Sequence, residues 1–393
     1  MISQSISLDA DSVIDEAIAI TGLDNFGVWD FREAMGRLLS SLDTEAKLNV
    51  DGRVMQRQKV VDILCTRLHL ESLVAKYPEI IDEEIENPIV IVGLPRTGST
   101  VLLRMLAVDQ RFYSNAYWEA RYPVPLQTQD FSGLNDPRIA MVNAEVKAML
   151  ETVPDIIAMH PLDAMAADEE ISLLEQSFFS TNPEAWANVP SYGRWLANQD
   201  QTQAYEYLKR LLQCLQWQKK RRGIVSDRWV LKTPHHVHWM DVLLKVFPDA
   251  QIIQTHRDPL KIMPSIASMC YGLWKLSTDD PDAKIVGQQW NSKWASGLAS
   301  CMKVREGQPA NRFLDIQFAD TVKRPIETLK TIYSFVGMEL TGSVRSAVDK
   351  WLKKNSRDQR PPHEYSLSKF GLSEEQIKRD YAEYRHRYLN RND

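Results

Sequence analysis

The chain has 393 residues, of which 44% are hydrophobic and 25% charged, so it is long enough for one large domain or two smaller ones with a substantial core. A net charge of −5 argues against general nucleic-acid binding and makes any positive potential local to a site. No stretch reaches about 18 apolar residues, so we expect a chain that does not span a membrane. The four cysteines form no C-x-x-C pair, so we expect neither a zinc site nor a disulfide framework, and we expect the chain to work in the reduced cytoplasm.

The first 84 residues are predicted to be helical and carry no chemical motif. Their N-terminus lacks the basic and apolar regions of a leader peptide, so we expect none to be removed. Apolar residues at helical spacing, with Asp9 or Asp11 as the first N-cap and Gly22 as the first stop, predict helices over about 9–22, 31–42 and 49–70. We expect segment 1–84 to pack on a domain formed by residues 85–393 or to form an oligomer contact.

A glycine-bounded turn follows the first predicted strand. Residues 89–92, Ile-Val-Ile-Val, predict a strand buried on both faces, and the leucines after Thr100 predict a helix. The N–H groups and dipole of a helix N-terminus favour an anion, and Gly98 lets the backbone approach it closely. Arg96 lies inside the turn beside the hydroxyls of Ser99 and Thr100, which favours a phosphate or sulfate ligand over a purely structural turn.

This turn departs from the loop of nucleotide triphosphatases. The spacing from Gly93 is almost G-x-x-x-x-G-K-[ST], but Ser99 occupies the lysine position. Nucleotide triphosphatases need that lysine on the β- and γ-phosphates, together with Mg²⁺ held by an acid after a second strand. Neither feature is evident in the sequence, so a P-loop kinase or triphosphatase is the weaker alternative.

Glu119 is the first acid that we consider as a catalytic group. Aromatic residues surround it in segment 112–123 before prolines end regular structure. The chain between Arg96 and Glu119 is long enough for one helix and a return toward the strand ends, so Glu119 could lie near the turn. A solvated surface acid is an equally good interpretation.

A helical insert over about residues 135–225 is rich in Met, Trp and Tyr. Such a block between strands commonly forms an acceptor pocket, and its aromatic residues also suit a core. The acids Asp168, Glu169 and Glu170 precede an apolar helix, and stabilisation of the helix dipole explains them without a function. Glu170 remains able to face the cleft.

The second predicted strand, residues 229–231, ends at Lys232-Thr233-Pro234-His235-His236. Because the carboxyl ends of strands line the ligand crevice of an open α/β sheet, Lys232 and the two histidines are candidate site residues. A metal site is not expected, since the crowding of these histidines suits strand alternation and not the i, i+4 spacing of a helical zinc motif.

Residues 251–255 predict a third strand, which is followed by Arg257 and then by a helix that carries Ser265. A strand-end arginine and a hydroxyl of the next helix converge on one anion in this arrangement, whereas the alternative is a loop salt bridge. Residues 313–318 alternate as a fourth strand, and Pro325 starts a helix that ends near Gly337.

The C-terminal tail is basic between residues 353 and 360. Such a stretch is often a solvated face, but a basic loop near a phosphate site can close over it. Arg360 is therefore a candidate ligand-binding residue. Ser373 and Gln376 form a capping box for the last helix.

The sequence predicts two anion-binding sites, one with Arg96 and one with Arg257 and Ser265. Together they indicate a ligand with two anionic groups. In this order the motifs resemble a bacterial branch of the sulfotransferases that use 3′-phosphoadenosine 5′-phosphosulfate (PAPS), over roughly residues 85–375. The resemblance implies a P-loop-type parallel α/β sheet flanked by helices. It also implies transfer of a sulfuryl group to a hydroxyl or amine, without a metal.

The resemblance also implies residue roles. The 5′-phosphosulfate would be held by the loop residues Arg96, Thr97, Gly98, Ser99 and Thr100. Arg257 and Ser265 would hold the 3′-phosphate, and Lys232 would steady charge on the departing phosphate. The general base is expected at His235 or His236, which resemble the base of the cytosolic enzymes, or at Glu119, which resembles the base of other members.

The acceptor expected from the insert is a small, partly apolar alcohol, phenol or lipid, although sugars also stack on tryptophan. We expect no nucleic-acid partner and keep a homo-oligomer open. A non-catalytic nucleotide-binding protein is the remaining alternative. It would keep both arginines but transfer nothing.

Overall fold

The computed structural model describes residues 6–126, 136–152, 162–355 and 366–389. Its centre is a parallel sheet of five strands in the order β2-β3-β1-β4-β5. The strands are β1 Ile89–Gly93, β2 Phe112–Tyr113, β3 Arg228–Lys232, β4 Gln251–His256 and β5 Phe313–Gln317. Four of them were predicted from the sequence. β2 was not, because two residues are too few to show an alternating pattern.

The predicted burial of β1 on both faces is confirmed. Val90 and Val92 belong to the larger hydrophobic core, whereas Ile89 and Ile91 belong to a second core on the other side of the sheet. Alternate side chains of a strand point to opposite faces, so an uninterrupted β-branched run suits a central strand with helices on both faces. This placement puts the turn after β1 in the middle of the sheet edge.

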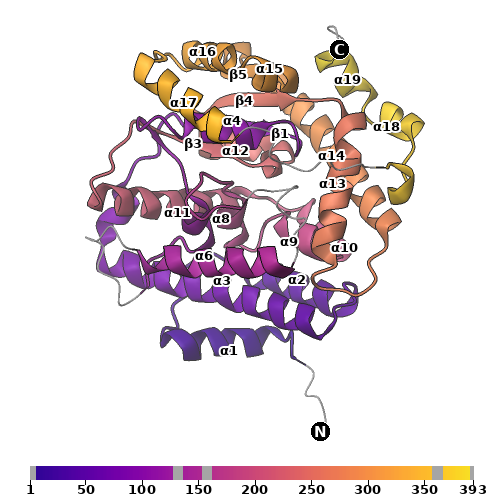
Figure 1. Ribbon diagram of the computed structural model, residues 1–393. Coiled ribbons are helices and arrows are strands. Elements are labelled where there is room, and N and C mark those ends of the chain that lie inside the picture. The colour runs from indigo at the N-terminus through magenta and orange to yellow at the C-terminus, as the bar shows by residue number, and fades with distance from the viewer. Residues whose placement is uncertain (1–5, 127–135, 153–161, 356–365, 390–393) are drawn as a thin grey trace.

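The second core lies between the sheet and the helices α4 Ser99–Leu106, α16 Pro325–Phe335 and α17 Gly342–Lys354. Figure 1 shows α16 and α17 on this side of the sheet, and the layer of α3 Val50–Lys76 on the other side. The larger core contains residues of the helices α12 Met240–Val246, α13 Pro259–Trp274 and α14 Ala283–Glu306. Helices therefore cover both faces of the sheet.

The first three predicted helices are present as α1 Ala10–Thr21, α2 Arg32–Thr44 and α3 Val50–Lys76. Asp9 caps α1 by accepting from the Ser12 N–H at 3.0 Å, and Gly22 ends the helix at a φ of 66°. Figure 1 shows these helices as the layer farthest from the sheet. Arg67 of α3 is buried between the rings of Phe31 and Tyr207, at 4.4 and 4.5 Å, and so ties this layer to the insert.

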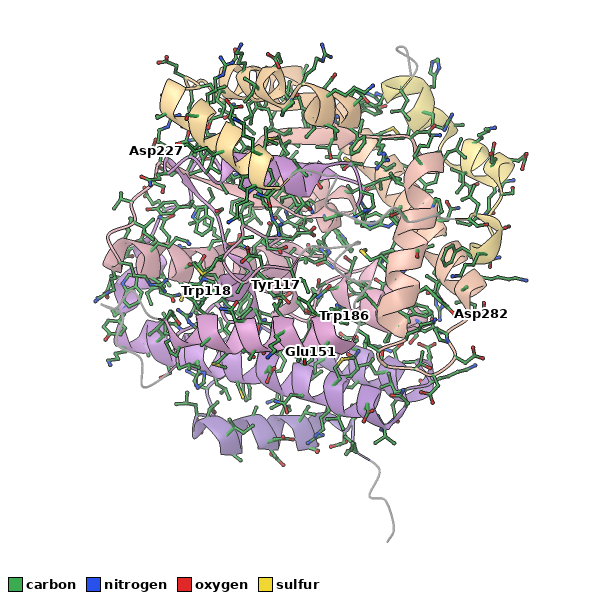
Figure 2. All side chains as sticks on the ribbon, in the orientation of Figure 1. Tyr117, Trp118, Glu151, Trp186, Asp227 and Asp282 are labelled. Atoms are coloured by element: carbon green, nitrogen blue, oxygen red, sulfur yellow. The ribbon has the colours of Figure 1, made fainter. Side chains whose placement is uncertain are left out.

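The insert is helical in its described residues, with α6 Pro137–Thr152, α8 Ile171–Glu175, α9 Asn182–Trp186, α10 Pro190–Leu196 and α11 Thr202–Arg221. Tyr192 and Tyr207 are fully buried, as the core interpretation of these aromatic residues predicts. A small third core joins α6 to α5 Tyr117–Arg121 through Trp118, which Figure 2 labels in the middle of the molecule.

The remaining helices follow β5 and complete the C-terminal part, namely α15 Phe318–Lys323, α18 Glu374–Asp380 and α19 Ala382–Tyr388. Ser373 caps α18 by accepting from the Gln376 N–H at 3.2 Å, as predicted. Short 3₁₀ turns are η1 Pro78–Asp82, η2 Pro234–Val237, η3 Ala310–Arg312 and η5 Ser368–Phe370. Within the described ranges, no helix combines the length and the apolar character that crossing a bilayer requires.

Candidate active site

The loop between β1 and α4 has the backbone of an anion-binding turn. Arg96 and Gly98 have φ angles of 69° and 84°, and Gly98 is the N-cap of α4. A Cβ at Gly98 would lie 3.2 Å from the ring of Phe318, which is a tight contact, and the positive φ angle strains any larger residue at this position. The first N–H groups of α4 have no partner within the helix and point out of its N-terminus, at the carboxyl edge of the sheet.

Thr97 fastens this loop to the next strand. Its side chain is fully buried, and its hydroxyl lies 2.7 Å from the Leu94 carbonyl oxygen and 2.6 Å from the Thr255 hydroxyl of β4. The hydroxyl therefore holds the loop in shape, which leaves the Thr97 backbone for a ligand. Ser99 is also buried, whereas Thr100 is partly exposed in the first turn of α4.

Lys232 reaches the N-terminus of α4 from the neighbouring strand. It is the last residue of β3 and pairs in register with Ile91 of β1. Its ammonium lies 3.3 Å from the Thr100 hydroxyl and forms an ion pair with Glu169. The Lys232 side chain is 3% exposed and that of Glu169 17%. A lysine from β3 thus stands beside the position where Ser99 replaces the usual loop lysine.

Arg257 meets the same loop from the opposite side. It follows β4, and its Nη1 donates to the Arg96 carbonyl oxygen at 2.8 Å, while its guanidinium stacks 3.9 Å over the Phe318 ring. The two arginines predicted to share a crevice are therefore neighbours. Ser265 lies buried in the second turn of α13, whose first turn is capped by Asp258. Arg360 lies outside the described residues.

The profile described as the sulfotransferase family matches residues 88–342. The chain belongs to the sulfotransferase family. Its P-loop-type α/β fold is shared with two solved structures: sulfotransferase STF1 from Mycobacterium tuberculosis H37Rv, with a TM-score of 0.83, and sulfotransferase STF9 from Mycobacterium avium, with a TM-score of 0.86. The former is 31% identical and covers 97% of this chain and 100% of its own, and the latter is 26% identical and covers 98% and 97%.

A curated relative is the omega-hydroxy-beta-dihydromenaquinone-9 sulfotransferase Stf3 of Mycobacterium bovis (strain ATCC BAA-935 / AF2122/97). It is 28% identical over 264 residues, which are 64% of this chain and 63% of that protein. The match therefore spans less than two thirds of the relative. The family and fold expected from the sequence are both confirmed.

In this member of the sulfotransferase family, His236 is enclosed by polar partners. Its Nε2 lies 2.7 Å from Glu170 Oε1, and its Nδ1 lies 2.8 Å from the Tyr205 hydroxyl. The other oxygen of Glu170 accepts from the backbone N–H of Lys232 at 2.6 Å. His236, Glu170 and Tyr205 are all fully buried. Together they fix the backbone from which the Lys232 side chain extends.

His235 is buried on the other side of the same turn. The strand-like alternation expected for the histidines is wrong, because Pro234 begins the 3₁₀ turn η2 and Thr233 caps it. His235 stacks 4.4 Å from the Trp239 ring, and its Nδ1 accepts from the Thr181 N–H at 3.3 Å, which places the ring proton on Nε2. Burial, with His236 and His238 nearby, holds the pKa of His235 well below its usual value, so the ring is neutral at pH 7.

Glu119 lies in a buried ion-pair network of the insert. It is the third residue of α5, and its carboxylate accepts from the Ala116 N–H at 2.9 Å. Lys219 Nζ lies 2.7 and 2.6 Å from its two oxygens, and Arg222 Nη1 lies 3.9 Å away. The side chain of Glu119 is 3% exposed, so the alternative of a solvated surface acid is wrong.

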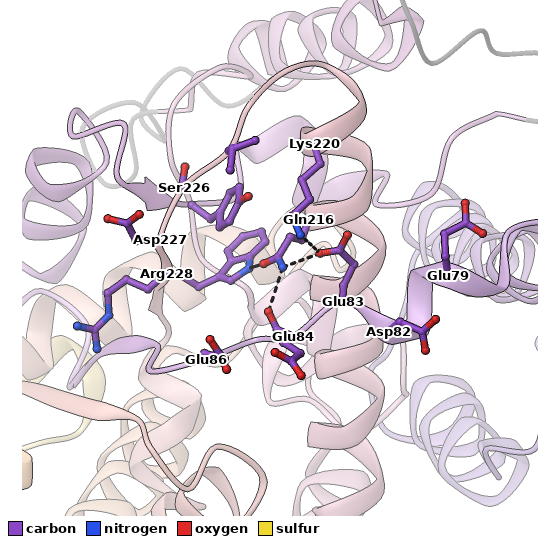
Figure 3. A pocket seen from close by; sticks show the side chains of 13 residues that line it. Glu79, Asp82, Glu83, Glu84, Glu86, Gln216, Lys220, Ser226, Asp227 and Arg228 are labelled. Carbon is purple, nitrogen blue, oxygen red and sulfur yellow. Dashed lines mark hydrogen bonds and ion pairs between the residues drawn. The ribbon is translucent and has the colours of Figure 1, made fainter.

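An acidic pocket of about 420 Å³ lies at the other edge of the sheet. Figure 3 shows Glu83, Lys220 and Arg228 among its lining side chains. Arg228 begins β3, whereas Lys232 ends it, so this pocket is separate from the β1–α4 loop. In the part of the chain that the structure describes, no group of three or more histidines, cysteines or acids is arranged to hold a metal.

Proposed function

We propose that this chain transfers the sulfuryl group of PAPS to a hydroxyl or amine of a small, partly apolar acceptor, by in-line displacement assisted by a general base. One observation carries the proposal, namely the convergence of two cations on one turn. Lys232 Nζ lies 3.3 Å from the Thr100 hydroxyl, and Arg257 Nη1 lies 2.8 Å from the Arg96 carbonyl oxygen.

The residues present fit a donor with two separated anionic groups. The loop from Arg96 to Thr100 offers backbone N–H groups and a helix N-terminus to the 5′-phosphosulfate. Arg257, with the Ser265 hydroxyl on the following helix, would hold the 3′-phosphate as a forked guanidinium. Bound in this way, the donor supplies an activated sulfuryl group and a phosphate leaving group.

The chain's own residues would then act on charge and position. Lys232 would offset the negative charge that develops on the departing phosphate, since an ammonium held at the site needs no reorganisation during the reaction. The loop would fix the sulfur for in-line attack. The sequence places the base at His235, His236 or Glu119, and these assignments remain proposals.

The acceptor class rests on the insert and on the curated relative. The name of that relative describes a hydroxylated menaquinone as its substrate. We propose a lipid-like alcohol as the acceptor of this chain, with a phenol or a sugar as the other options. We also propose a cytoplasmic setting, because all four cysteines are free thiols.

Nucleotide binding tests the donor. A ligand that binds only the folded protein at 100 times its Kd raises the free energy of unfolding by about 2.7 kcal/mol. We therefore expect adenosine 3′,5′-bisphosphate to raise the melting temperature clearly, and ADP or MgATP to raise it far less at equal concentration. Transfer is then measured from PAPS to farnesol and to 4-nitrophenol. Equal shifts from ADP, or a larger one from MgATP, would exclude the proposed donor in favour of a triphosphate.

A further inference from the structure

We propose that Glu169 is the general base of the reaction, and that its ion pair with Lys232 keeps it inactive until the donor binds. The inference rests on the proposed function and adds a residue that the sequence motifs do not mark. The residue is an acid of the insert that, from the sequence, is explained by stabilisation of a helix dipole.

Glu169 is placed at the reaction centre by its partner. Its carboxylate forms an ion pair with Lys232, whose ammonium lies 3.3 Å from the Thr100 hydroxyl at the start of α4. Arg104 Nε of α4 donates to the Ala167 carbonyl oxygen at 3.1 Å, and Asn115 Nδ2 donates to the Asp168 carbonyl oxygen at 3.0 Å, so the segment before α8 is held against α4. An anion at the N-terminus of α4 would therefore lie beside Lys232, which is ion-paired with Glu169.

The other nearby acids and bases are fully buried. Glu170 uses one oxygen for the Lys232 backbone N–H and the other for His236. His236 also binds Tyr205, and all three side chains are fully buried. His235 is buried as well: its Nδ1 accepts from the Thr181 N–H, and its Nε2, which has no hydrogen-bond partner among the described residues, carries the ring proton in that tautomer and so cannot accept one. Glu169 differs, because its side chain is 17% exposed and its carboxylate is bound by the Lys232 ammonium.

Donor binding changes the partner of that ammonium. Lys232 is 3% exposed, so its ammonium stays between α4 and the insert, where Glu169 is its anionic partner and a bound donor would be a second one. A phosphosulfate at the N-terminus of α4 competes with Glu169 for Lys232, and the phosphosulfate group carries two negative charges, whereas the carboxylate carries one. When Lys232 turns to the donor, the exposed carboxylate of Glu169 can rehydrate and is left beside the sulfuryl group.

The step balances without a further reactant. The acceptor hydroxyl gives its proton to the Glu169 carboxylate while its oxygen bonds to sulfur. The bond between sulfur and the phosphate oxygen breaks, and its electron pair leaves with adenosine 3′,5′-bisphosphate. Lys232 offsets the charge on that leaving group, and it returns to Glu169 after the proton has passed to water and the nucleotide has left.

Glu169→Gln tests the inference with two acceptors. With farnesol, an alcohol that needs a base, we expect kcat to fall about 100-fold or more. With 4-nitrophenol, which is largely ionised in mildly alkaline buffer, we expect a much smaller loss. We also expect adenosine 3′,5′-bisphosphate to bind more tightly, because Lys232 no longer has a competing carboxylate.

Glu184→Gln is the matched control. Glu184 is 17% exposed, like Glu169, and binds Lys293 at 2.6 Å in another part of the insert. We expect this variant to match the wild type with both acceptors and in nucleotide affinity. It measures the effect of removing one partly exposed ion pair from the same layer.

Three results would overturn the assignment. The first is Glu169→Gln turnover of farnesol close to that of the wild type. The second is an equal loss with both acceptors together with weaker nucleotide binding, which would make Glu169 only an anchor for Lys232. The third is a base-dependent loss seen in His235→Ala instead. If the wild type itself binds ADP as well as adenosine 3′,5′-bisphosphate, the proposed function fails and not this assignment alone.

Discussion

Arg257→Ala is expected to remove the preference for a 3′-phosphate. Arg257 follows β4, stacks 3.9 Å over Phe318 and donates to the Arg96 carbonyl oxygen at 2.8 Å. The side chain therefore has two separable functions in the proposal. One is to stabilise the loop through the Arg96 carbonyl, and the other is to bind the 3′-phosphate with its charge.

The magnitude follows from these contacts. A hydrogen bond to a charged group contributes about 1.5–3 kcal/mol, and 1.4 kcal/mol corresponds to a tenfold change in affinity. Arg257→Ala should therefore lower the affinity that the 3′-phosphate provides by about 10- to 150-fold. Loss of the bond to the Arg96 carbonyl, about 0.5–1.5 kcal/mol, loosens the loop for every nucleotide alike. The ratio of two affinities therefore isolates the phosphate contribution.

Calorimetry with adenosine 3′,5′-bisphosphate and AMP gives that ratio, because the two ligands differ only in the 3′-phosphate. We expect the wild type to prefer the bisphosphate and Arg257→Ala to bind both ligands nearly alike. Arg385→Ala is the control, since Arg385 is also partly exposed and pairs with the adjacent Asp258. An Arg257→Ala protein that keeps the wild-type ratio would refute the reasoning.

Two further predictions concern buried groups. Glu119→Gln breaks the buried ion pair with Lys219 and should lower the free energy of unfolding, measured by urea denaturation, by about 3–5 kcal/mol. The affinity for nucleotide should change little. Normal stability together with a loss of turnover of about 100-fold would instead make Glu119 the base. His235 has a lowered pKa in the folded state, so below about pH 6.5 the unfolded chain binds a proton that the folded one excludes, and stability falls by about 1.4 kcal/mol per pH unit. Because burial also lowers the pKa of His238, His235→Asn should reduce the slope by that amount between about pH 6.5 and 5 and leave the remainder, and an unchanged slope would show that His235 is already protonated when folded.

Local patterns in the sequence predicted much of the fold. The β-branched run of β1, the Asp9 cap and the Gly22 stop each act through neighbours a few residues away, and all three are present. The turn between β1 and α4 was predictable for the same reason, because its glycines and the strand and helix beside it are consecutive in the chain. Arg257 was found as a residue at a strand end, which parallel topology places at the same edge as Arg96.

Long-range contacts decided the rest. Glu169 and Lys232 are separated by 63 residues, and Glu119 and Lys219 by 100. No pattern of spacing indicated either pair, and Glu169 and Glu119 alike had a simple interpretation as exposed or helix-capping acids. The two acids are distinguished only in the folded chain, where the Glu169 carboxylate lies beside the N-terminus of α4 and the Glu119 carboxylate is paired with Lys219 of the insert. Hydrogen bonds and packing between adjacent residues make local structure readable from the sequence, whereas charges act through space and take their partners from the tertiary fold.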